Sequence, residues 1–332
     1  MMLNKKVRHI LSSSRLLFIM AAILIFMAIY EPSFFNTDNL VNIISHASIN
    51  GIVAVGMTPL MIAKAFDISV GSIMVLSGVI SIMLVNKFDP VTAILIGTLS
   101  GILLGWFNGF LVARLKINSF ISTLGTMVIY QGIAFVITNM QPITTESAAF
   151  QKFATVEVFG VPILIVYFII VMLLIWFILR FTGLGKNSYA IGGNEAACRL
   201  MGINVERYIT IFFIISGLGA SFAGVVLSSK LNAASAVFGE NVSLLVIAGI
   251  VLGGVHLTGG VGTISGVIQG IILIGLLDNI TIYLGLFGYY QMFFRSLILI
   301  GVVIFDVIYI KQAANRLQKE ELMKTKSLVA TQ

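Results

Sequence analysis

The sequence predicts an all-α polytopic membrane protein with about ten transmembrane helices. The chain of 332 residues is 58% hydrophobic and only 10% charged, and its mean hydropathy of +1.06 is far above that of soluble domains. Apolar runs of roughly 18 or more residues recur along the whole length, and each can cross a bilayer as a helix. The basic residues gather in the short segments between these runs, where they indicate membrane orientation.

The apolar runs define the spans in order. The first follows a basic tail (1–13) without a small-x-small cleavage pattern, so we interpret it as an uncleaved spanning helix. The eighth is short, and we expect a broken or tilted helix beside glycine-rich backbone. A single transmembrane domain (14–310) thus precedes a second tail (311–332). The predicted spans are 14–31, 40–63, 68–86, 91–113, 119–138, 160–180, 208–229, 242–255, 263–284 and 289–310.

The charge distribution orients these spans. With the N-terminus inside, sixteen Lys and Arg lie in cytoplasmic segments and only Lys87, Lys152 and Lys230 lie outside. Because positive residues concentrate in cytoplasmic loops, we expect both termini in the cytoplasm. The basic residues that give the net charge of +7 therefore indicate the orientation of the spans in the membrane. They do not indicate a nucleic-acid partner, and we expect none. The single cysteine excludes an internal disulfide, and the three histidines are too far apart in sequence to suggest a metal site.

The only long cytoplasmic connection, 181–207, carries the polar stretch "YAIGGNEAACRLMGINVERY". Asn194 is a favourable N-cap, and Glu195 adds an acid to the first helical turn. Gly202 is a favourable C-terminal stop, and Glu195 stands four residues before Arg199 in the stabilising order. The stretch therefore predicts a helix of about two turns.

This short helix has an apolar stripe formed by Ala197, Leu200 and Met201. Two turns are not stable alone in water, so the stripe needs a cover. The residues leave two covers open: the membrane surface of the protein itself, or a cytoplasmic partner.

Four segments together resemble one family. "GGNEAACRLMGINV" is similar to the cytoplasmic loop of permease subunits of bacterial ABC importers in the ribose/xylose/arabinose/galactoside branch. "FDISVGSI" (66–73), "INSFISTLGTMVIYQG" (117–132) and "VLGGVHLTGGVGTISG" (251–266) resemble further segments of these permeases in the same order. Several motifs in register over roughly 40–310 are more specific than one short pattern.

The resemblance implies a subunit that forms the pathway of an ATP-driven importer for a monosaccharide such as ribose. It implies four partners: an ABC ATPase subunit that uses MgATP, an extracytoplasmic sugar-binding protein, a second permease chain, identical or not, and the small-molecule sugar itself. The chain has no G-x-x-x-x-G-K-[ST] phosphate loop, so we expect neither a cofactor nor catalysis in the chain itself. By resemblance, the residues that contact the ATPase are Gly193, Asn194, Glu195, Ala196, Ala197, Arg199 and Gly202.

Polar side chains inside the spans form two further sets. Asp278 and Arg295 fall at a similar depth on adjacent spans, where an ion pair would reduce the burial cost of each charge. A hydroxyl-rich substrate would need donors and acceptors along its path, but interhelical hydrogen bonds explain intramembrane Asn and Gln equally well. The candidate pathway residues are Asn50, Asn108, Gln131, Asn279 and Gln291.

Two other functions remain open. One is the same type of permease for a nucleoside or a sugar-derived signal molecule. The other is an ion-coupled secondary transporter, which would need an intramembrane carboxylate such as Asp278. Similar short segments, such as "GWFNG" (105–109) and "GLLDN" (275–279), also suggest a weak internal duplication.

Overall fold

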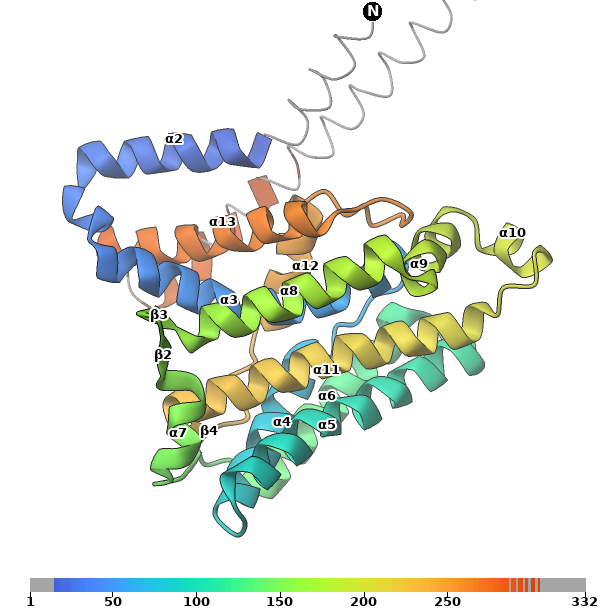
Figure 1. Cartoon of the computed structure of the whole chain (residues 1–332), viewed down its shortest axis with the longest axis horizontal. Helices are drawn as coiled ribbons and strands as arrows, with labels where there is room; N and C mark the ends of the chain where they lie inside the picture. The colour runs from blue at the N-terminus through green and yellow to red at the C-terminus, as the bar shows by residue number, and fades with distance from the viewer. Residues whose placement is uncertain are drawn as a thin grey trace, which may run out of the picture. The chain divides into compact units, whose positions relative to one another are not determined.

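The computed structural model describes residues 15–286, 288–290, 292–294, 296–297, 300–301 and 304. The chain divides into two compact units, Met1–Asn279 and Ile280–Gln332. The first unit contains the connection between α8 and α11 and both cavities described below. It is built almost entirely from helices, drawn in Figure 1.

The longer helices reproduce the predicted order. Six are long and apolar enough to cross a membrane, and three shorter apolar helices accompany them in the described residues. Asp89 caps one of them by accepting a hydrogen bond from the Thr92 amide at 2.9 Å, as expected of an acid before a first-turn proline. The helices at predicted spans are α2 (Arg15–Tyr30), α3 (Thr37–Ile62), α4 (Val70–Val85), α5 (Pro90–Gly109), α6 (Ser119–Thr138), α8 (Ile163–Phe181), α11 (Val205–Leu231), α12 (Val242–Leu252) and α13 (Ile264–Tyr283).

The tenth span, 289–310, is described only in part. The described residues from 289 to 304 are helical, and the rest of this span lies outside the described residues. The helical fold is therefore confirmed, while the count of ten, the cytoplasmic termini, the internal duplication and the domain limits stay predictions. The short eighth span is confirmed as an 11-residue helix that ends at Gly253.

Helix α11 is the centre of the first unit and packs against α5, α3 and α4. Small residues allow this packing. A Cβ added at Gly101 on α5 would lie 2.2 Å from the Gly217 carbonyl oxygen on α11, so only glycine permits the two backbones to approach this closely. At this point α5 and α11 pack backbone against backbone, with no large side chain between them.

Several short elements were not predicted. The longest predicted outer loop contains α7 (Ala148–Thr155), and a further helix, α9 (Gly183–Gly193), precedes the predicted cytoplasmic helix, which is α10 (Glu195–Leu200). Two turns of helix follow α2 and α5: the 3₁₀ turn η1 (Pro32–Phe35) and the π-helical turn η2 (Phe110–Arg114). Four two-residue strands form two antiparallel pairs: β1 (Ile143–Thr144) with β4 (Ala233–Ala234), and β2 (Glu157–Val158) with β3 (Val161–Pro162).

Reporter fusions should place Gln332 in the cytoplasm and the loop near Ala148 outside. The physical reason is the sixteen-to-three division of basic residues, which favours one orientation. Paired reporters that are active only in the cytoplasm or only outside it would measure each location. An external Gln332 or an internal Ala148 would contradict the span count.

Candidate functional site

The candidate site is the connection between α8 and α11, which holds α9 and α10 and is predicted to lie in the cytoplasm. The Asn194 side chain caps α10 by accepting a hydrogen bond from the Ala197 amide at 3.0 Å. Gly202 ends the turn with a φ of +80°, a conformation that glycine adopts without strain. Asn204 then caps α11 through the Arg207 amide at 3.0 Å. The predicted short helix and its caps are thus confirmed.

One side of the connection is fastened to the helix bundle. The Ser188 hydroxyl donates to the Pro59 carbonyl at 2.7 Å, and the Tyr189 hydroxyl donates to the Gly262 carbonyl at 2.9 Å. A Cβ at Gly192 would lie 1.9 Å from the Ile62 carbonyl oxygen and 2.4 Å from the Gly260 amide nitrogen. This connection therefore touches the end of α3 and the glycine-rich segment after α12 without room for a side chain.

A network of charges holds α10 against its neighbours. Arg199 pairs with Glu195 at 2.8 Å, as the spacing predicted, and also with Glu206 on α11 at 2.6 Å. Glu206 in turn pairs with Lys116, which follows η2. Hydrogen bonds with Glu206 and then Glu195 raise the pKa of the Arg199 guanidinium above its ordinary value. Because these groups are substantially exposed, each pair stabilises the fold by only about 0.2–1 kcal/mol.

The apolar side chains of α10 divide between two faces. Cys198 is only 2% exposed and packs in a cluster with Leu60, Ala113 and Val205. Leu200 is 91% exposed and Met201 is 69% exposed. Ala197 is half-buried, so the expected stripe is not uniform, and its uncovered part is the Leu200–Met201 end.

The remaining coupling candidates lie on the outer side. Gly193, Asn194, Glu195 and Ala196 are exposed, and a Cβ at Gly193 would meet nothing within 4 Å. Figure 1 shows α10 at one end of the unit, beyond the neighbouring helices. Between α10 and the bundle lies a cavity of about 490 Å³, whose walls include Lys64, Lys116 and Arg199. The connection thus contacts the bundle at one edge and stands away from it at another.

No hydrogen bond joins the described candidate pathway residues to one another, and their role in a pathway stays a prediction. Asn279 exchanges two hydrogen bonds with Asn39, at 3.2 and 2.9 Å. Gln131 donates to the Ala236 carbonyl at 3.4 Å, Asn50 is half-buried on α3, and Gln291 lies outside the described residues. The 490 Å³ cavity beside α10 is lined by none of these described residues. Asn279, Gln131 and Asn108 each form a hydrogen bond with a different segment of the chain.

A buried acid escaped the sequence reasoning, which took Asp278 and Arg295 as the clearest intramembrane ionisable residues. Asp67 is 0% exposed. Its carboxylate accepts hydrogen bonds from the hydroxyls of Ser69 at 2.6 Å and Ser216 at 3.1 Å, and Asn108 donates to Ser69 at 2.7 Å. The cluster ties the segment before α4 to α5 and α11. An acid followed by two serines within "FDISVGS" was the available signal.

The proposed pair of Asp278 and Arg295 is not tested, because Arg295 lies outside the described residues. Asp278 is half-buried on α13. The ion pair therefore stays a prediction.

Comparisons with known proteins agree on the family. The family model described as "Branched-chain amino acid transport system / permease component" matches residues 39–303. The ribose import permease RbsC of Haemophilus influenzae is 36% identical over 308 residues, which cover 91% of this chain and 95% of that protein. RbsC of Escherichia coli is 37% identical over 293 residues (86% and 91%), and the L-arabinose permease AraH of Escherichia coli is 36% identical over 302 residues (91% and 92%). No solved structure matches.

These relatives are permease subunits of importers and not enzymes, which confirms the expectation of a transport subunit without catalysis. Together with the long apolar helices, they establish a multi-pass protein of the bacterial inner membrane. The chain belongs to the family of branched-chain amino acid transport system permease components, in a group that includes the sugar permeases of ABC importers.

Proposed function

We propose that this chain forms the translocation pathway of an ATP-driven importer for a monosaccharide such as ribose, and that α10 couples it to a separate ATPase subunit. The observation that carries the coupling role is the contrast on α10. Its Cys198 side is buried in the bundle, while Leu200 at its end and Met201 directly after it are 91% and 69% exposed. An apolar pair held at the tip of a fixed helix suits a docking contact, in which a few buried anchors supply most of the binding energy.

The cargo is inferred from the relatives. The family description names branched-chain amino acids, whereas the similar proteins are named as permeases for ribose, L-arabinose and D-allose. These three are sugars of similar size and polarity, so we favour a monosaccharide. A nucleoside or a sugar-derived signal molecule is the second candidate cargo.

The partners follow from the same proposal. An extracytoplasmic binding protein delivers the sugar, a second permease chain completes the pathway, and the ATPase uses MgATP. ATP binding would draw the two α10 helices together, and the connection fastened at Ser188, Tyr189 and Gly192 would transmit that movement to α3.

Purification of the tagged chain from its own host tests the proposal. An ATPase subunit and a binding protein should copurify, and the ligand of that binding protein should be a monosaccharide. Uptake should require ATP and persist when the proton and sodium gradients are collapsed at constant ATP. Uptake that stops with the gradients and continues without the ATPase would instead identify an ion-coupled transporter.

A further inference from the structure

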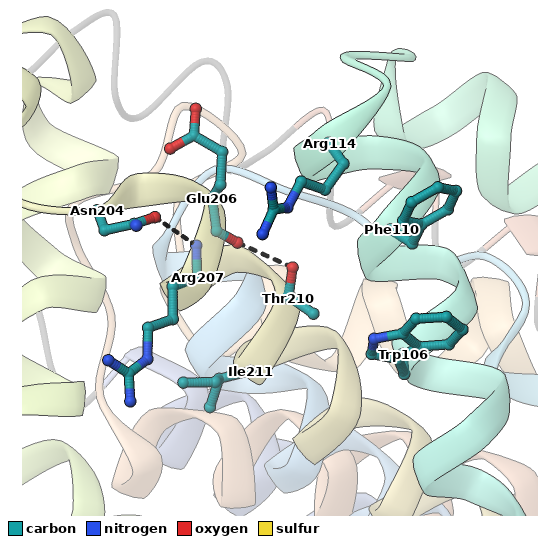
Figure 2. Close-up of a pocket in the computed structure, with 8 residues that line it drawn as sticks. All are labelled: Trp106, Phe110, Arg114, Asn204, Glu206, Arg207, Thr210 and Ile211. Atoms are coloured by element: carbon teal, nitrogen blue, oxygen red, sulfur yellow. Dashed lines mark hydrogen bonds between the residues drawn. The ribbon is translucent and has the colours of Figure 1, made fainter.

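A second cavity lies where η2 and the end of α5 meet the beginning of α11. Its volume is about 690 Å³, and Figure 2 shows the residues that line it. We call it the α5–α11 groove. No residue of α10 lines it.

Aromatic and aliphatic side chains form one wall of the groove. The rings of Trp106 and Phe110 are stacked with centroids 5.8 Å apart, and the side chains are 47% and 37% exposed. They extend an exposed stripe on α5 that includes Leu99 and Leu103, which are 53% and 65% exposed. Spacings of three and four residues place all four side chains on one helix face. In a membrane protein, such a bare apolar face is the one that lipid chains cover.

Two arginines give the other end of the groove its charge. Figure 2 shows the Arg114 guanidinium directed toward the beginning of α11, while the Arg207 side chain extends beside Ile211, away from Arg114 and from both aromatic rings. Among the residues that the structure describes, no acidic side chain pairs with Arg114 or Arg207. Both guanidinium groups are therefore available to an anion.

The other polar groups of the groove are already engaged. Glu206 directs its carboxylate to Lys116 and Arg199, so those two cations neutralise it. The Asn204 side chain caps α11, and the Thr210 hydroxyl donates to the Glu206 carbonyl at 2.8 Å. The groove is left with two uncompensated positive charges above an apolar wall.

The order of the aromatic and basic side chains along the helix axis fits the interface between a bilayer and the cytoplasm. Trp106 precedes Arg114 by eight residues, or about 12 Å of helix. Tryptophan is enriched at membrane interfaces, and arginine is enriched on the cytoplasmic side. The π-helical turn Phe110–Arg114 widens the helix where the apolar wall meets the charges.

We propose that the α5–α11 groove binds an anionic phospholipid of the cytoplasmic leaflet. Arg114 contacts its phosphate, an acyl chain lies on Trp106 and Phe110, and Arg207 turns from its position beside Ile211 toward the same headgroup. Basic pockets between transmembrane helices on this side of a membrane are suited to anionic headgroups. A free phosphate ion would satisfy the arginines but leave the aromatic wall bare. The proposal uses the predicted orientation of the spans and is independent of the coupling role of α10.

The two tryptophans of the chain allow a matched test on the full-length protein in lipid discs. The Trp176→Phe variant leaves Trp106 as the only tryptophan, and the Trp106→Phe variant leaves Trp176, which lies four residues before Arg180 at the end of α8. Tryptophan fluorescence is then measured while brominated phosphatidylglycerol or brominated phosphatidylcholine replaces the unlabelled lipid.

Trp106 should be quenched by the anionic lipid at a mole fraction roughly 25-fold lower than by the zwitterionic lipid, since each of the two arginines near the headgroups contributes about fivefold in affinity. Arg114→Gln together with Arg207→Gln should remove this preference, and about 1 M salt should weaken it. Trp176 should show no such preference, and Arg180→Gln should leave the Trp106 preference unchanged.

Three results would overturn the proposal. Equal quenching of Trp106 by the two lipids would show that the arginines select no headgroup. A preference that survives the double arginine change would locate the anion elsewhere. Protection of Trp106 from both lipids would show that a protein, such as a second copy of the chain, covers the groove instead.

Discussion

Replacing Leu200 by arginine should abolish cargo uptake while the chain reaches the membrane at normal abundance. Leu200 is 91% exposed, so a longer polar side chain meets no neighbour in the described part of this chain. If the ATPase covers this side chain, the change buries an unpaired charge in the contact. Such a change costs several kcal/mol, enough to lower ATPase affinity on the order of a hundredfold or more.

Uptake in cells and retention of the ATPase during purification measure the effect. Leu115→Arg is the matched control, because Leu115 is also an exposed leucine, at 54%, on the predicted cytoplasmic side but not on α10. Normal uptake and normal ATPase retention in the Leu200 variant would exclude this face as the docking surface. The helix would then lie on the membrane, which is the other cover that the sequence leaves open.

Gly192→Ala should weaken both folding and coupling, whereas Gly193→Ala should change neither. A Cβ at Gly192 would lie 1.9 Å from a backbone oxygen of α3, while a Cβ at Gly193 would meet nothing within 4 Å. Backbone cannot move aside as a flexible side chain can, so overpacking here should cost about 1–3 kcal/mol. The two glycines are adjacent and receive the same methyl group, so the comparison isolates the close contact.

Thermal unfolding of the purified chain measures the stability cost, and ATP hydrolysis stimulated by the loaded binding protein measures the coupling. We expect the Gly192 variant to unfold at a lower temperature and to respond weakly to the binding protein. Equal behaviour of the two alanine variants would show that the connection does not act through its contact with α3.

The sequence predicts the parts of this structure that depend on local interactions. Asn194, Glu195 and Arg199 interact within a single turn or two of helix, so their spacing specifies the cap and the ion pair. The spans follow in the same way, since a long apolar run has one stable conformation in a bilayer. The Gly202 stop requires only the positive φ of one residue.

Contacts between distant segments were beyond this reasoning. Glu206 meets Lys116 across 90 positions of sequence, and Ser216 meets Asp67 across 149. No local period predicts which helix ends become neighbours. Asp67 was overlooked because it lies between two apolar runs, where an acid usually indicates a solvated loop. The helix α9 was missed because four of its eleven residues are glycine, which disfavours helix.

Because Cys198 is buried, the reactivity of its thiol reports whether α10 is packed against the bundle in the native chain. It is the single cysteine of the protein, and it lies on the inner side of α10 at 2% exposure. A thiol-reactive label can reach this sulfur only when α10 separates from the bundle. The labelling rate therefore measures that separation directly, without engineered cysteines or a cysteine-free background, at each stage of the ATP cycle.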